Sequence, residues 1–264
     1  MIQRKTPEQL DKMAAAGRIL ARCHEMLRSK ARPGVTTAEL DEAAERFIRS
    51  QGAEPAFKGY RGFPGSICAS PNSMVVHGIP GSYRLNRGDV LSIDIGVILD
   101  GWVADAAITH PIGPVTPVAK RLLATTRAAL FDAVDQCLVG NRLGDVSSAV
   151  QSRVEAEGFG VIRSLVGHGI GRDMHEDPQI PNYGEPGTGP ELEEGMALAI
   201  EPMVNVGGPH VRMGSDGWAV FSQDGSLAAH FEHTVAITAD GPRILTPWHE
   251  LMPDAAAPAA APAG

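Results

Sequence analysis

Two aspartates lie close together on a predicted β-hairpin. Residues 90–99 and 102–109 are rich in β-branched side chains and flank Asp100-Gly101, a dipeptide typical of two-residue hairpin turns. With that turn, Asp94 and Asp105 lie on one face, one diagonal step apart. Such neighbours are roughly 7–8 Å apart at the backbone, so their carboxylates can converge. A solvated sheet face is the alternative. However, isoleucine and valine occupy both faces of this hairpin, and carboxylates in apolar surroundings need a cation or a proton.

Three histidines and two glutamates stand in contexts that suit a metal or substrate site. His168 lies between glycines, which allow the backbone to approach another group closely, and His175 follows seven residues later. His77 precedes a glycine. Glu201 ends one apolar run, and Glu232 leads into another. Each histidine alone is more often a hydrogen-bonded structural residue, and each glutamate alone could face water at a strand end.

Together, the two aspartates, the two glutamates and one histidine form an oxygen-rich set of ligands. Such a set suits Mn, Fe, Co or Zn, including a pair of ions that share carboxylates and activate water as a nucleophile. The three cysteines, Cys23, Cys68 and Cys137, are too few and too scattered for a disulfide framework or a thiolate zinc site. Any metal must therefore be held by oxygen and imidazole.

Helices and strands that could position these residues follow a repeated order. Capping boxes at Thr6 and Thr36 predict helices that end near Arg28 and before Gly52, and further helices are expected from Thr116 to about Val139 and over residues 145–157. Further strands are predicted over residues 196–204, 233–238 and 243–246. Two helices followed by strands thus occur twice, which indicates two similar halves that meet near residue 113.

The composition is that of an ordinary globular protein. The chain has 264 residues, of which 43% are hydrophobic and 20% charged, and its net charge of −8 argues against a nucleic-acid partner. There is neither an apolar run of roughly 18 residues nor an apolar stretch behind the first charges, so we expect a cytoplasmic protein without a membrane anchor. We predict one catalytic domain over residues 1–252, with halves of about 1–112 and 113–252, and a disordered Ala/Pro tail over 253–264.

Seven short segments resemble those of one known family. They are Tyr60-Arg61-Gly62-Phe63-Pro64, Val76-His77-Gly78-Ile79-Pro80, Ser92-Ile93-Asp94-Ile95-Gly96, Gly167-His168-Gly169-Ile170-Gly171, Ile200-Glu201-Pro202-Met203, Asp216-Gly217-Trp218 and Phe231-Glu232-His233-Thr234. In order and spacing, the sequence resembles the type I methionine aminopeptidases of the bacterial kind, in peptidase family M24. The resemblance implies an α+β pita-bread fold, with two pseudo-symmetric halves of helices packed on a curved, mostly antiparallel sheet.

The resemblance also implies roles for individual residues. Asp94 and Asp105 would hold one divalent ion, and His168, Glu201 and Glu232 the other, with Asp105 and Glu232 bridging. Glu201 would also accept the proton of the nucleophilic water, while His77 and His175 would contact the substrate and stabilise the oxyanion-like intermediate. The substrate pocket would be formed by Phe57, Tyr60, Phe63, Cys68, Met174 and Trp218, together with His77 and His175. The alternative for the first six is ordinary core packing.

The chain departs from the family pattern at several positions. Arg61 stands where bacterial relatives often have histidine, and Gly96 where many have threonine near the metal. Val103-Ala104 replaces a usual His-Gly, and Met174 replaces an aromatic residue. None of these changes removes a predicted ligand, but each bears on the shape of the pocket or the affinity for metal.

The implied function is a metal-dependent methionyl aminopeptidase that removes the initiator methionine from nascent proteins when the second residue is small. The cofactors would be two divalent ions (Co, Mn, Fe or Zn), and we expect a monomer that contacts the ribosome transiently. One alternative is an Xaa-Pro-type peptidase on the same fold, although those usually carry a large extra N-terminal domain. Another is a catalytically weak binding protein derived from the fold, although all five ligands are present here.

Overall fold

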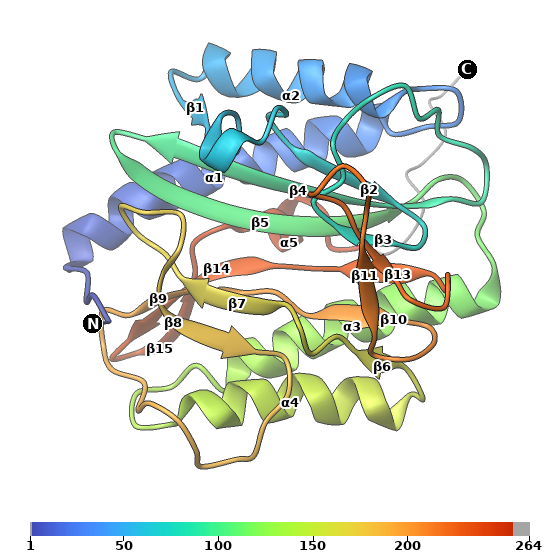
Figure 1. Cartoon of the computed structure of the whole chain (residues 1–264). Coiled ribbons are helices and arrows are strands. Elements are labelled where there is room, and N and C mark those ends of the chain that lie inside the picture. Colours follow the sequence, from blue (N-terminus) through green and yellow to red (C-terminus); the bar gives the residue numbers. More distant parts are fainter. Residues whose placement is uncertain (1, 256–264) are drawn as a thin grey trace.

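The computed structural model describes residues 2–255 (Figure 1). Four long helices and two short ones occur in this range. They are α1 (Pro7–Lys30), α2 (Thr37–Ser50), η1 (Tyr60–Gly62), α3 (Pro117–Asp135), α4 (Leu143–Ala156) and α5 (Trp248–Leu251). No described helix is long and apolar enough to cross a membrane.

Both predicted capping boxes are confirmed. The side chain of Thr6 accepts a hydrogen bond from the backbone of Gln9 and that of Thr36 from Glu39, and the Gln9 and Glu39 side chains accept from the two cap residues in return. Caps of this kind contribute about 1 kcal/mol each to helix stability. The third helix ends at Asp135, earlier than predicted, and the chain turns before α4 at Gly140, whose φ of 88° lies outside the helical region.

The strands all pair antiparallel and form four sheets. A four-stranded sheet contains β1 (Glu54–Pro55), β2 (Cys68–Pro71), β4 (Val90–Leu99) and β5 (Trp102–Pro111). A five-stranded sheet has the order β15 (Gly241–Ile244), β14 (His233–Thr238), β9 (Ala197–Ile200), β7 (Val166–Gly169) and β8 (Glu176–Pro181). Two three-stranded sheets have the orders β13 (Ala228–His230), β10 (Met203–Asn205), β6 (Gly160–Val161), and β11 (Val211–Met213), β12 (Val220–Ser222), β3 (Met74–Val76).

The β4–β5 hairpin has the predicted register. Gly96 pairs with Asp105, so no side chain from Gly96 separates the two aspartates. The hairpin then meets β14 of the five-stranded sheet, where the hydroxyl of Thr234 donates to the carbonyl of Asp105 at 2.8 Å and accepts from its N–H at 3.0 Å. The backbone N–H of Glu232 donates to the carbonyl of Ala107 at 2.9 Å. The two large sheets thus meet where Asp105 and Glu232 lie.

The prediction of one strand over residues 196–204 is wrong. The structure has β9 and β10 instead, separated by Glu201-Pro202. Proline lacks the N–H that a ladder requires, so the strand is interrupted there. The chain passes from the five-stranded sheet to a three-stranded sheet at this point, and Glu201 lies at the crossing.

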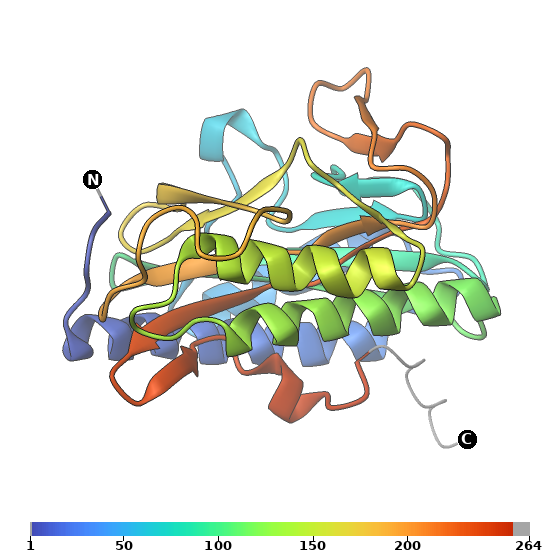
Figure 2. The same cartoon turned by 90° about the horizontal axis from the view of Figure 1, so that it is seen from below.

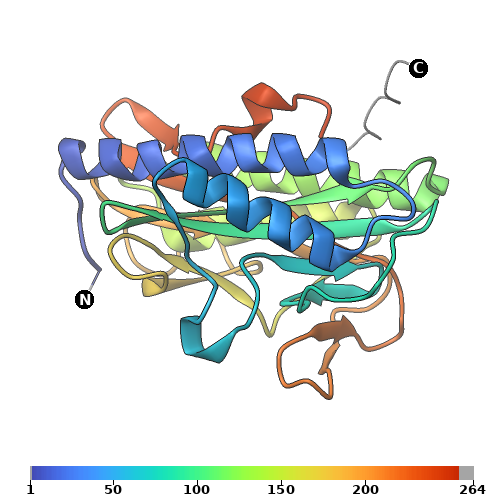
Figure 3. The same cartoon turned by 90° about the horizontal axis from the view of Figure 1, so that it is seen from above.

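Two sides of the molecule differ in the elements that they carry. Figure 2 and Figure 3 show α1 and α5 on one side, and η1 with the β11–β12 hairpin on the other. The core between helices and strands includes fully buried Met13, Phe231 and Trp248. The α+β architecture, with helices packed on antiparallel sheets, agrees with the predicted fold class. Residue 113 lies in the loop between β5 and α3.

The first residues of the predicted tail are held in place. Residues 253–255 form a turn, in which Ala255 is buried and Asp254 forms a 2.8 Å ion pair with Arg28 of α1. The expectation of disorder therefore does not hold for these three residues, since they pack against a helix. The rest of the predicted tail, residues 256–264, lies outside the described residues.

Candidate metal centre and substrate pocket

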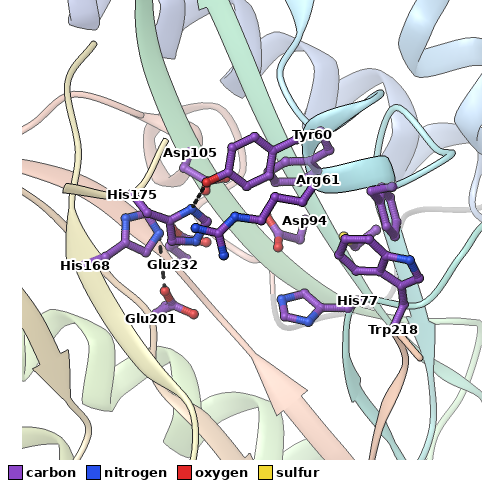
Figure 4. Close-up of a pocket in the computed structure, with 13 residues that line it drawn as sticks. Tyr60, Arg61, His77, Asp94, Asp105, His168, His175, Glu201, Trp218 and Glu232 are labelled. Atoms are coloured by element: carbon purple, nitrogen blue, oxygen red, sulfur yellow. Dashed lines mark hydrogen bonds and ion pairs between the residues drawn. The ribbon is translucent and has the colours of Figure 1, made fainter. Parts of the chain in front are cut away.

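One pocket brings together residues from segments that are far apart in the sequence (Figure 4). It is lined by Phe57, Tyr60, Arg61, Phe63, Cys68, His77, Asp94, Asp105, His168, His175, Glu201, Trp218 and Glu232. These include every predicted ligand and every predicted substrate residue except Met174. Met174 is 5% exposed and packs in an apolar cluster with Phe57 and Tyr60 instead of lining the pocket.

The five predicted ligands lie on or directly beside strands of the two large sheets: Asp94 is on β4, Asp105 on β5 and His168 on β7, whereas Glu201 directly follows β9 and Glu232 directly precedes β14. Ligand atoms of Asp105, His168 and Glu232 all lie within 4.8 Å of one another. Glu201 stands beside them, with Oε1 3.6 Å from Nε2 of His168. Asp94 lies in the same pocket, on β4 next to the strand of Asp105. The predicted ligands therefore form one cluster at the base of the pocket.

The carboxylates of this cluster are removed from water. Asp105 is 4% and Glu232 2% exposed. Burial, reinforced by neighbouring carboxylates, raises the pKa of Asp105, Glu201 and Glu232 well above their usual values. Burial also raises the pKa of Asp94. The cluster thus concentrates acidic groups where their negative charges are unfavourable.

The donor set fits divalent cations. Oδ1 of Asp94, Oδ1 of Asp105 and Oε1 of Glu232 are buried and have no hydrogen-bond partner among residues 2–255. Buried polar atoms are normally paired, and four acidic groups around a neutral imidazole need positive charge. His168 suits this role because burial lowers its pKa, which leaves Nε2 free to ligate, while Nδ1 lies 2.9 Å from the carbonyl of Gly169.

Two further histidines stand at the pocket without belonging to the cluster. The ring of His175 lies 4.2 Å from that of His168 and stacks on Tyr60, whose hydroxyl is 2.8 Å from Nδ1 of His175. Desolvation, followed by electrostatic repulsion from the protonated forms of His168 and His77 and from Arg61, lowers the pKa of His175 to about 4. Burial likewise lowers the pKa of His77, whose backbone has a φ of 59°. Both rings are therefore neutral near pH 7 and can each donate one hydrogen bond.

The opposite wall of the pocket is apolar. Phe63 and Trp218 pack edge to face, with ring centroids 5.1 Å apart. Cys68 is 5% exposed and pairs with Asp94 across β2 and β4, so the sulfur-bearing wall adjoins the acidic cluster. Asp216 holds the turn at Trp218 by accepting the backbone N–H of Trp218 at 2.9 Å. The pocket therefore has one apolar and one acidic end.

Comparisons with known proteins agree with this geometry. The profile of "Metallopeptidase family M24" matches residues 11–239. The chain is 53% identical over 246 residues to "Methionine aminopeptidase 1" of Bacillus subtilis, which covers 93% of this chain and 99% of that protein. The chain belongs to the methionine aminopeptidase group of metallopeptidase family M24.

Solved structures show the same relationship. The methionine aminopeptidase of Thermotoga maritima superimposes with a TM-score of 0.92 at 45% identity, covering 93% of this chain and 99% of that one. The Xaa-Pro dipeptidase of Bacillus anthracis shares the fold, with a TM-score of 0.75 at 23% identity, but this chain covers only 61% of it. The M24 pita-bread fold predicted from sequence is confirmed.

Gly96 has a structural explanation in this M24 peptidase. A Cβ at this position would lie 2.8 Å from Cε of Met174 and 2.8 Å from Cε1 of Phe57. The two side chains thus fill the space that a larger residue at position 96 would need. The departures at positions 96 and 174 are therefore coupled through packing, and both adjoin Phe57, which lines the pocket.

Sequence reasoning missed one residue that adjoins the cluster. His230 is 1% exposed, and its Nε2 lies 3.7 Å from Oε2 of Glu201 and 3.8 Å from Oε2 of Glu232. Neither ring nitrogen has a hydrogen-bond partner within the described part of the chain. Its position two residues before Glu232 was the available signal, because alternate residues of an extended segment share a face.

Proposed function

We infer that this protein is a metal-dependent aminopeptidase that removes the N-terminal methionine from proteins. The observation that carries this inference is the pocket itself, in which an apolar wall of aromatic and sulfur-bearing residues ends at a buried acidic cluster. The methionine aminopeptidases at 51% and 53% identity, which match over 99% of their own length, support the same activity.

We propose that five residues hold two divalent ions of Co, Mn, Fe or Zn. Asp94 and Asp105 would ligate one, and His168, Glu201 and Glu232 the other, with Asp105 and Glu232 shared between them. The unpartnered oxygens of Asp94, Asp105 and Glu232 support this assignment. When bound, such ions act as Lewis acids that polarise the scissile carbonyl and make water a stronger nucleophile.

The protein side chains would then bind, orient and move protons. Glu201 is our candidate for the proton acceptor, because its side chain is 14% exposed, whereas that of Glu232 is 2% exposed. His77 and His175 would donate hydrogen bonds to the oxygen on which negative charge develops, as neutral imidazoles placed at the pocket can do. The stacked Tyr60 would hold the His175 ring in that orientation.

The substrate class follows from the two ends of the pocket. An apolar slot with Cys68, Phe63 and Trp218 suits an unbranched thioether side chain. Arg61, His77 and His175 border the approach to the acidic cluster (Figure 4). We therefore propose that a small second residue (Gly, Ala or Ser) is preferred. Nascent chains in the cytoplasm, met during transient contact with the ribosome, would be the natural substrates of a monomeric enzyme.

The test is release of the first residue from peptides by metal-depleted protein before and after addition of Mn²⁺, Co²⁺ or Fe²⁺. We expect no release without metal, and on its addition rapid release from Met-Ala-Ser but slow release from Leu-Ala-Ser and Arg-Ala-Ser. Full activity in a verified metal-free sample would contradict the hydrolytic mechanism. Preferential cleavage of Xaa-Pro peptides would favour the alternative peptidase, and metal binding without any cleavage would favour a binding protein.

The arginine at position 61 should weaken substrate binding. It lines the pocket, its guanidinium carbon lies 5.3 Å from the centre of the Tyr60 ring, and it forms no ion pair with a residue in the described range 2–255. At a separation of roughly 7 Å and an effective dielectric near 20, its charge and the substrate's α-ammonium group repel by about 2 kcal/mol before salt screening. We expect Arg61→His to raise kcat/KM for Met-Ala-Ser up to about tenfold at low salt, mainly through KM.

A second stacked arginine provides the control for this measurement. Arg163 lies 5.0 Å over the ring of Tyr183 and does not line the pocket, so Arg163→His should leave kcat/KM unchanged. The gain at Arg61 should shrink as ionic strength rises. An unchanged or lower kcat/KM for Arg61→His at low ionic strength would reject the repulsion.

A further inference from the structure

The segment before α1 crosses the loop that carries Met174 and His175. All three views place the start of the chain at the same end of the molecule as the β7–β8 loop (Figures 1, 2 and 3). The backbone N–H of Lys5 donates to the carbonyl of Gly195 at 2.7 Å. The side chain of Lys5 is only 3% exposed, and its Nζ donates to Oε2 of Glu176 at 2.5 Å. An ion pair as deeply buried as this needs both partners, since the loss of one leaves an uncompensated charge.

The second oxygen of Glu176 organises the loop. Its Oε1 accepts the backbone N–H of Arg172 at 2.9 Å and that of Asp173 at 3.4 Å. A Cβ at position 171 would lie 2.5 Å from both this oxygen and Cε of Lys5, so the close approach requires Gly171. One carboxylate thus joins the N-terminal segment to the turn that immediately precedes His175.

We propose that Lys5 is a positioning residue, which acts through Glu176 to fix the loop 171–176 and thereby the orientation of the His175 ring in the pocket. This rests on the function proposed above for His175. The ring lies between Tyr60 and His168 at contact distances, so a shift of the loop backbone changes both contacts. Misplacement of a catalytic group by about 1 Å can cost on the order of 100-fold in rate.

The alternative is that the Lys5–Glu176 ion pair only anchors the N-terminal segment to the rest of the protein. The neighbouring pair provides the comparison, because Arg4 and Glu193 form a 2.8 Å ion pair with side chains that are 54% and 52% exposed. If Lys5 only fastens the segment, its loss should lower thermal stability without acting through His175.

The experiment compares Lys5→Met, Lys5→Arg and the control Arg4→Met in the metal-loaded, full-length protein. We expect Lys5→Met to lower kcat for Met-Ala-Ser by about 10- to 100-fold with little change in KM and unaltered metal content. Lys5→Arg should retain most of the wild-type kcat, and Arg4→Met should have the same kcat and KM as wild type. In a His175→Ala background, Lys5→Met should change kcat by less than about twofold, since the two residues act as a unit.

Two further measurements keep the proposal falsifiable. The imidazole NMR signals of His175 should shift in Lys5→Met but not in Arg4→Met, a readout that is independent of turnover. If Lys5→Met does not fold, Glu176→Gln replaces it in every comparison. Equal losses from Lys5→Met with and without His175, or unshifted His175 signals, would overturn the positioning role. Absence of methionine release by wild type would instead refute the proposed function.

Discussion

Glu201→Gln should lower kcat for methionine release at least about 100-fold, the usual cost of losing a general base. Glutamine keeps the size of the side chain but removes the negative charge and the proton acceptor. The carboxylate lies in the pocket, 3.6 Å from Nε2 of His168, and is the more accessible of the two glutamates in the acidic cluster. The measurement is steady-state kinetics on Met-Ala-Ser at saturating Mn²⁺ or Co²⁺, together with the metal content of the variant.

A matched control for Glu201→Gln is Glu185→Gln, since Glu185 is exposed and does not line the pocket. We expect wild-type kinetics from that variant. The metal content separates the two roles proposed for Glu201, because a variant that retains metal but loses turnover has lost the proton acceptor. Near-normal kcat in a metal-loaded Glu201→Gln protein would place the base elsewhere.

The second large effect is expected for Asp105→Ala, which should lose both bound metal and peptidase activity. Asp105 is 4% exposed, and its ligand atom lies within 4.8 Å of those of His168 and Glu232. Alanine removes the oxygens that we propose to be shared by two ions. Loss of a residue that only hydrogen-bonds to a metal ligand already lowers metal affinity about 10- to 100-fold. Loss of a ligand shared by two ions should therefore lower metal affinity at least about 100-fold. Isothermal titration calorimetry with Mn²⁺ measures this metal affinity directly.

The fold of Asp105→Ala should survive. The two hydrogen bonds between residue 105 and Thr234 use backbone atoms of residue 105, so alanine retains them. Asp135→Ala, at an exposed position at the end of α3, controls for loss of charge and should bind metal normally. Undiminished Mn²⁺ affinity in folded Asp105→Ala would contradict the proposed shared ligand.

Local signals in the sequence were sufficient for the existence of the four long helices and for the hairpin, but not for the end of α3 or for the short η1 and α5. The capping boxes at Thr6 and Thr36 act over three residues, and the Asp100-Gly101 turn determines the pairing of its own flanking strands. The diagonal placement of Asp94 and Asp105 follows from that turn alone. The family resemblance, in turn, supplied residues that no local pattern connects.

Tertiary packing decided how the halves of the site meet. The contact of β5 with β14 depends on hydrogen bonds between Asp105 and Thr234, which are 129 residues apart. The strand break at Glu201-Pro202 could have been expected from proline, but the crossing between two sheets could not. Arg61 likewise carries no local signal for its direction, and only the structure places it on the pocket.

Turns, caps and side-chain alternation operate over a few residues, so the long helices, the hairpin and the chemical types at the site could be predicted from the sequence. Which of these residues lie close together depends instead on the packing of segments that are distant in the sequence. His230, at the end of β13, lies 3.7 Å from Glu201, which follows β9, and Lys5 contacts Glu176 over a separation of 171 residues. Contacts of this kind form when apolar faces pack and bring distant polar groups together, and the buried charges then require partners that local patterns do not specify.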